Sequence, residues 1–213
     1  MGADYFPRLS GVHTDNLKIK EMVNQQAEMA ILIIAPIMLL YLTSLPVLIP
    51  LLYSNEFLPI IPFTQWVVLG MLFKAASWTM GFVILAKGET KLFFWIEVLF
   101  YSLLLCCNVG GYYFFGLEGI GISFLVLYII HFFVLLTVCG KKYELSFTKS
   151  FFKIFVVQLI FCTIAFLVAY FFQYPIAYIS GGILLVFSCL YSYKELNNRI
   201  GIKEFIQSKI GKK

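Results

Sequence analysis

The sequence predicts an all-α protein that crosses a lipid bilayer several times, and its composition and hydropathy pattern both indicate this class. Hydrophobic residues make up 61% of the 213 residues and charged residues 13%, whereas soluble domains average about 45–50% and about 25%. The hydrophobic residues also form long runs, several of them beyond the roughly 18 residues that signal a transmembrane helix. A polytopic helical membrane protein accounts for both observations.

Six membrane-spanning helices are expected, with boundaries good to a few residues. They cover about 28–53, 63–86, 92–115, 119–139, 154–173 and 175–193. Residues 1–27 precede them as a connector, in which a polar helix capped near Thr14 or Asp15 leads into the first span. Residues 194–213 follow as a basic tail, which is either a short amphipathic helix on the membrane surface or a disordered segment.

The distribution of lysine and arginine predicts the orientation of these helices, because cytoplasmic loops retain positive charge. Of the 16 basic residues, 15 fall in segments that lie on one side of the six-span arrangement. They are Arg8, Lys18, Lys20, Lys87, Lys91, Lys141, Lys142, Lys149, Lys153, Lys194, Arg199, Lys203, Lys209, Lys212 and Lys213. The opposite loops, around Glu56, Glu118 and residues 173–174, contain none. Both termini and the basic loops are therefore expected in the cytoplasm.

Lys74 is the sixteenth basic residue and the first candidate for function, because ionisable residues inside spans are costly and commonly functional. It lies near the middle of its span, about 18 Å from either end at the helical rise. Gly70, Ser77 and Gly81 share its helical face, and Trp78 is a further candidate on the same span. This stripe either packs tightly against a neighbouring helix or lines a hydrated cavity, and the charge favours the cavity.

A second group of polar candidates lies in the third and fourth spans. Glu97 lies about six residues into its span and shares a helical face with Tyr101 and Asn108. His131 lies at a similar depth in the following span, with a height difference of about 5 Å, so that it can pair with Glu97. The alternatives are an acid that reaches headgroup water and a histidine that is packed and hydrogen-bonded without a role in proton transfer.

Three prolines in the first span are hinge candidates, since each removes a helical hydrogen bond. They are Pro36, Pro46 and Pro50. Transporters use such broken helices as hinges, but static kinks are at least as common.

Several function classes are disfavoured by the sequence. It has no nucleotide-binding loop and no hydrolase or metalloprotease motif, so no catalytic residue, metal ligand or cofactor site is expected. The five cysteines lie in or beside hydrophobic runs without metal-ligand spacing, which is typical of packing residues. The net charge of +5 is located at helix ends rather than on a soluble face, which fits a bilayer surface and not nucleic acid.

Several strings in the first 140 residues resemble one family of transporters. These are "YFPRLS", the polar helix ending "VNQQAE", a span with Pro36, and then "LLYSNEF" and "VILAKGETK". They are similar to the C-terminal half of Wzx-type O-antigen and polysaccharide flippases in the multidrug/oligosaccharidyl-lipid/polysaccharide exporter superfamily. Such proteins usually have 12 to 14 spans in two lobes, so the resemblance implies that this chain corresponds to part of the C-terminal lobe.

The resemblance implies transport without bond chemistry in a bacterial cytoplasmic (inner) membrane. A polyprenyl-pyrophosphate-linked oligosaccharide would pass through a cationic cavity for the synthesis of O-antigen in lipopolysaccharide or another surface polysaccharide, and Lys74 suits its anionic head group. Expected partners are this lipid, the bilayer and other membrane proteins of polysaccharide assembly. A multidrug or cation antiporter of the same superfamily and a non-transporting fragment or subunit remain as alternatives.

Overall fold

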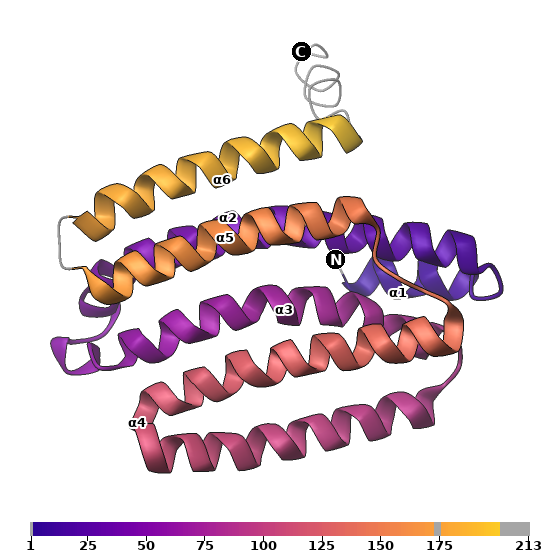
Figure 1. Ribbon diagram of the computed structural model, residues 1–213, viewed down its shortest axis with the longest axis horizontal. Helices are drawn as coiled ribbons and strands as arrows, with labels where there is room; N and C mark the ends of the chain where they lie inside the picture. Colours follow the sequence, from indigo (N-terminus) through magenta and orange to yellow (C-terminus); the bar gives the residue numbers. More distant parts are fainter. Residues whose placement is uncertain (1, 173–175, 201–213) are drawn as a thin grey trace.

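The computed structural model describes residues 2–172 and 176–200, and helices form nearly all of this part of the chain (Figure 1). In chain order the elements are α1 (Gly2–Gly11), α2 (Asn16–Leu52), the short 3₁₀ helix η1 (Asn55–Phe57), α3 (Ile60–Ala86), α4 (Thr90–Tyr143), α5 (Lys149–Phe171) and α6 (Ile176–Ile200). By length and composition, α2 to α6 are five helices long and apolar enough to cross a membrane. The predicted all-α class is confirmed.

The polar helix expected before the first span begins at Asn16 and continues into that span as α2, as predicted. Asp15 is the N-cap, and its carboxylate accepts hydrogen bonds from the backbone N–H groups of Leu17 and Lys18 at 3.1 and 3.2 Å. These bonds, chiefly the one from Lys18, lower the pKa of Asp15. Residues 16–52 then form one continuous helix of 37 residues.

The third and fourth expected spans belong to a single element, α4, with 54 residues. Its only non-helical backbone angles are at Gly116, where φ is 63° and ψ is −145°. A positive φ of this kind is accessible to glycine at little cost. Figure 1 shows that the chain reverses there, so that the arms 90–115 and 117–143 lie side by side. The sequence predicted two helices and a linker, whereas the structure needs only this one residue to reverse the chain.

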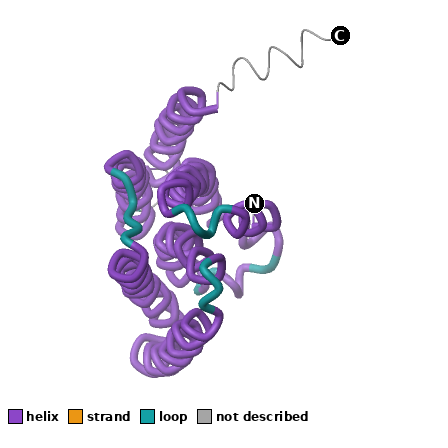
Figure 2. Tube along the Cα trace, turned by 90° about the vertical axis from the view of Figure 1, so that its right-hand side faces the viewer, coloured by secondary structure: helices purple, strands orange, loops and turns teal. Residues whose placement is uncertain are grey.

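The helices stack in a curved arrangement (Figure 2), and α3 lies between α2 and α4 (Figure 1). It packs against α4 on one side and against α2 on the other, and α2 also contacts α5 and α6. The short helix α1 packs on α3, where the Tyr5 hydroxyl donates to the Thr79 carbonyl at 3.1 Å. Leu9 of α1 is fully buried.

The connections that carry basic residues all lie at one end of the molecule (Figure 1). Side-chain contacts join them: Asn16 Nδ2 donates to the Tyr143 carbonyl at 3.1 Å, and Lys87 Nζ donates to Asn16 Oδ1 at 2.6 Å. We call this the basic end. The opposite end contains η1 and Gly116.

The expected basic tail is helical where the structure describes it. Helix α6 continues seven residues past the predicted end of the last span and ends at Ile200. Residues 201–213, which contain most of the predicted tail, lie outside the described residues.

Candidate functional site

A cavity of about 210 Å³ lies between α3 and the two arms of α4. Its lining residues are Lys74, Ser77, Trp78, Gly81, Phe82, Phe93, Glu97, Phe100, Tyr101, Tyr128, His131 and Leu135. Six of the seven cavity candidates from the sequence are in this set. The structure thus brings together polar residues from three helical segments that are up to 57 positions apart in the chain, counting from Lys74 to His131.

Lys74 occupies the middle of α3, about 18 Å from Ala86 and about 21 Å from Ile60 at the helical rise. Its ammonium lies over two rings of the second arm of α4, at 5.3 Å from the Tyr128 centroid and 5.7 Å from the Phe124 centroid. Within the described part of the chain, no carboxylate pairs with it. Lys74 is therefore a positive charge without a neutralising acid, held on the negative faces of aromatic rings.

The small residues around Lys74 serve both of the roles that the sequence left open. Gly70 packs tightly, because a Cβ there would lie 2.6 Å from Cδ1 of Phe124. Ser77 and Gly81 instead line the cavity. The Ser77 hydroxyl donates to the carbonyl of Phe73 on its own helix at 2.7 Å, so it is already satisfied.

Glu97 and His131 face each other across the cavity wall. His131 Nε2 lies 3.4 Å from Glu97 Oε1, although the geometry is not that of a hydrogen bond. The His131 ring is 7% exposed and stacks on Phe100 with centroids 4.1 Å apart. Neither ring nitrogen has a hydrogen-bond partner among residues 2–172 and 176–200. The pair is thus close enough for a direct or water-mediated contact.

Two aromatic side chains expose their surfaces at the open side of the cavity. Trp78 is 42% exposed and Tyr101 is 54% exposed. Trp78 packs edge to face on Phe82, with centroids 4.7 Å apart and planes at 90°. Lys74 is also exposed on this side, so the cavity opens where a cation and two ring systems meet.

Asn108 and the proline candidates lie elsewhere. Asn108, two turns beyond Tyr101 on α4, does not line this cavity, although its buried Oδ1 lacks a hydrogen-bond partner in the described part of the chain. Pro36, Pro46 and Pro50 are all in α2, which runs through them as one helix and contributes no residue to the cavity.

Trp78 and Tyr101 were candidates, but the other aromatic residues of the lining were not predicted from the sequence. Phe93, Phe100 and Tyr128 line the same cavity as the candidate polar residues. The chain has 23 phenylalanines and 13 tyrosines, so residue type alone does not distinguish these three from lipid-facing and core positions. Only the chain reversal at Gly116 brings Phe100 and Tyr128 together, with centroids 5.1 Å apart.

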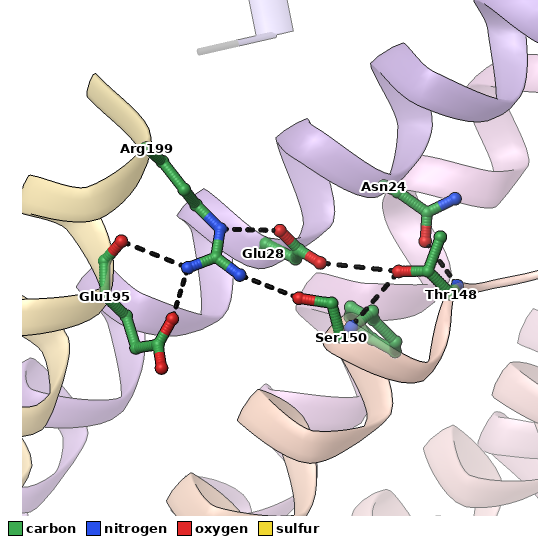
Figure 3. A network of polar contacts seen from close by, with 7 residues as sticks. Asn24, Glu28, Thr148, Ser150, Glu195 and Arg199 are labelled. Carbon is green, nitrogen blue, oxygen red and sulfur yellow. Dashed lines mark hydrogen bonds and ion pairs between the residues drawn. The ribbon is translucent and has the colours of Figure 1, made fainter.

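A second polar cluster joins α2, α5 and α6 at the basic end (Figure 3). The Arg199 guanidinium donates to Glu28 Oε2 at 2.8 Å, to Ser150 Oγ at 2.7 Å and to Glu195 Oε2 at 2.5 Å. Glu28 is only 6% exposed, and the Thr148 hydroxyl donates to its other oxygen at 3.4 Å. We call these contacts the Arg199 cluster.

The Arg199 cluster also differs from the sequence-based interpretation, which placed Arg199 in the basic tail and gave Glu28 no role. Both residues lie near the predicted membrane boundary, where charged side chains are common and do not by themselves indicate a functional site. Their spacing of 171 positions leaves no local signal that they pair.

Comparisons of the chain with protein-family models, with curated proteins and with solved structures gave no match.

Proposed function

We propose that this chain helps to move a lipid-linked oligosaccharide across a membrane, with the anionic head group held in the cavity between α3 and α4. The observation that carries the proposal is the Lys74 ammonium, which lines the cavity at mid-helix and has no acidic partner among the described residues. An anion bound there would supply the missing negative charge. The family resemblance of the first 140 residues supports the same substrate class.

The exposure of Lys74 favours a hydrated passage rather than contact with lipid. A charge facing hydrocarbon at the centre of a membrane helix costs about 2.5–3.5 kcal/mol on insertion scales. Lys74 is exposed on the open side of the cavity, together with Trp78 and Tyr101. We infer that further helices complete the passage on this side, which agrees with the two-lobe arrangement that the resemblance implies.

A cation antiporter is the second candidate, and Glu97 is the residue that favours it. Glu97 is the only carboxylate among the lining residues of the cavity. His131 Nε2 lies 3.4 Å from its carboxylate, and Lys74 adds a positive charge to the same space. An organic cation would be attracted by Glu97 and repelled by Lys74, whereas an anion would be attracted by Lys74 and repelled by Glu97.

A third candidate is a membrane subunit that packs against partner helices and transports nothing. On that account Lys74 would be neutralised by a carboxylate of the partner, and substitutions of Lys74 would alter assembly rather than transport.

Substitution of Lys74 in the source organism tests the proposal. Deletion of the gene should abolish a surface polysaccharide, and Lys74→Glu should do the same at an unchanged protein level because it reverses the charge. Lys74→Arg should retain more polysaccharide than Lys74→Ala, although the planar guanidinium is not equivalent to an ammonium. Lys91→Ala is the matched control, since Lys91 lies exposed near the start of α4 and does not line the cavity.

The polysaccharide assay separates the three candidates. Unchanged surface polysaccharide in both the deletion strain and the Lys74→Glu strain would overturn the flippase proposal. Drug sensitivity in the deletion strain, with normal polysaccharide, would favour the antiporter. Loss of the protein from the membrane in Lys74→Glu would favour the subunit that only packs.

A further inference from the structure

We propose that Lys74 and Trp78 together form a glycosyl-phosphate site, in which the ammonium holds the phosphate and the indole ring carries the first sugar. This inference rests on the proposed function and specifies which part of the head group the cavity recognises. Both residues line the cavity and both are exposed on its open side.

The spacing of the two residues suits such a ligand. Lys74 and Trp78 are four positions apart on α3, and residues at this spacing are neighbours on one helix face, with Cβ atoms about 5–6 Å apart. In a glycosyl phosphate the sugar ring is attached directly to the phosphate oxygen. Its anion and its ring therefore need adjacent binding positions of this kind.

The indole ring is held in place and is still available to a ligand. Its edge-to-face contact with Phe82, in which the ring planes are at 90°, fixes the ring orientation. At the same time 42% of the Trp78 residue remains exposed. One face of a sugar ring presents C–H groups, which pack favourably on the electron-rich face of an aromatic ring. The indole N–H has no hydrogen-bond acceptor within the described residues and can donate to a sugar hydroxyl.

The opposite wall provides complementary groups. Tyr101 is 54% exposed, and the Glu97 carboxylate can accept hydrogen bonds from sugar hydroxyls. The cavity volume of about 210 Å³ is smaller than the roughly 300–1,000 Å³ of sites for drug-sized ligands. It therefore has room for one sugar with its phosphate, and we infer that the remaining sugars lie outside this cavity.

Fluorine NMR can locate the binding site in the intact chain. We would incorporate 5-fluorotryptophan, reconstitute the protein in lipid nanodiscs, and titrate it with N-acetylglucosamine 1-phosphate, inorganic phosphate or N-acetylglucosamine. The Trp78 resonance is assigned by its absence in Trp78→Phe. We expect the sugar phosphate to shift the Trp78 resonance, whereas those of Trp66 and Trp95, which do not line the cavity, should stay unchanged.

Affinities for N-acetylglucosamine 1-phosphate and inorganic phosphate, measured from their ³¹P line widths, then separate the contributions of Lys74 and Trp78 to binding. Trp78→Leu should weaken binding of the sugar phosphate by about three- to tenfold, as expected for loss of one ring contact, and leave inorganic phosphate unaffected. Trp78→Phe should retain most of the affinity because it keeps a ring. Lys74→Gln should weaken both probes.

The outcomes distinguish this inference from the proposed function. Equal sugar-phosphate affinity in Trp78→Leu and the wild type, with weaker binding in Lys74→Gln, would overturn the sugar site and leave an anion site at Lys74. Wild-type affinity for both probes in Lys74→Gln would overturn the inference. It would also contradict the anion-binding role of Lys74 on which the proposed function depends. A sugar-phosphate titration that shifts no tryptophan resonance would overturn the inference alone, because the polysaccharide assay tests transport independently.

Discussion

At the scale of single residues, most hydroxyl groups within the helices are satisfied by their own backbone. Ser77 donates to the Phe73 carbonyl, Thr79 to the Ala76 carbonyl, and Thr137 to the Phe133 carbonyl, at 2.7–2.8 Å. These groups therefore offer little to a ligand. The ionisable cavity residues Lys74 and His131 differ, since they have no hydrogen-bond partner within the described residues. They give the cavity its polarity.

Asp15 is a residue outside the membrane helices whose protonation should affect stability. Its pKa is lowered because the carboxylate accepts backbone hydrogen bonds at the start of α2. A lowered pKa in the folded state stabilises the protein above the pKa of the unfolded chain, and this contribution is lost as the pH falls through the folded value. Acidification below about pH 4 should therefore increase amide exchange at residues 17–19.

Asp15→Asn is the control for this prediction, because asparagine is a comparable N-cap that does not titrate. Hydrogen–deuterium exchange, corrected for the intrinsic pH dependence of the amides, should show an acid-induced increase in the wild type and none in Asp15→Asn. An equal increase in both proteins would exclude Asp15 as the cause.

At the scale of the elements, the sequence predicted where helices occur better than how they connect. Hydrophobic runs located both arms of α4 and a linker at 116–118, and of the five glycines between positions 110 and 121 only Gly116 lies in that linker. The structure assigns the positive φ to Gly116 and a different role to two others. Gly111 and Gly119 face each other across the arms, where a Cβ on Gly111 would lie 2.5 Å from the Gly119 carbonyl oxygen.

Gly111→Ala should therefore separate the arms of α4 and destabilise the protein. The added methyl group would contact backbone, which cannot move aside as a side chain can, and overpacking of this kind typically costs about 1–3 kcal/mol. The adjacent Gly110 is the matched control, since a Cβ added there would have no neighbour within 4 Å. Thermal unfolding in detergent should show a lower Tm for Gly111→Ala only, and similar values for both variants would contradict this packing.

The length of α6 was underestimated for a different reason. Lys194 and Glu195 are typical of the start of a solvated tail. A local sequence pattern cannot show that Arg199 pairs with Glu28 in α2. In the structure, the polar side chains of α6 follow one stripe: Ser188 and Ser192 bond to the buried Gln158 of α5 at 2.7 and 2.8 Å. Arg199 extends this stripe at the basic end. Such polar contacts hold membrane helices together where the hydrophobic effect does not.

Arg199→Ala should loosen α6, because it leaves the buried Glu28 carboxylate without its cation. Breaking a fully buried ion pair costs about 3–5 kcal/mol, and the 24% exposure of the Arg199 side chain reduces this penalty. Hydrogen–deuterium exchange in 176–199 should increase. Adding Glu28→Gln to Arg199→Ala should restore part of the loss by removing the unpaired charge; a double variant less stable than Arg199→Ala would refute the pairing.

At the scale of the whole molecule, α3 separates two polar regions with different surroundings. The cavity lies between α3 and α4 and opens to the surface, while the Arg199 cluster lies between α2, α5 and α6. The candidates from the sequence include six of the twelve residues that line the cavity. Asn108 was also a candidate and does not line it, because residue type shows that a buried polar group needs a partner and does not show where the helix directs it.

The arrangement of the loops allows a labelling test of membrane orientation. Single cysteines would replace Leu17 and Lys141 at the basic end, and Asn55 and Phe115 at the opposite end, all of them exposed positions. The five native cysteines must first be replaced. Cys139 and Cys162 are fully buried, with thiols that lie 3.7 and 3.9 Å from the carbonyl oxygens of Met80 and Ala35, so alanine or serine at these positions requires a check of folding.

We predict that the basic end faces the cytoplasm, because lysine- and arginine-rich loops resist translocation. A membrane-impermeant maleimide applied to intact cells should label cysteines at positions 55 and 115, whereas positions 17 and 141 should react only after the inner membrane is permeabilised. Since the structure places each pair of positions at one end, the members of a pair must behave alike whichever way the protein inserts. Reversed labelling of both pairs would refute the orientation alone; labelling of position 55 but not 115 from outside would contradict the chain reversal at Gly116.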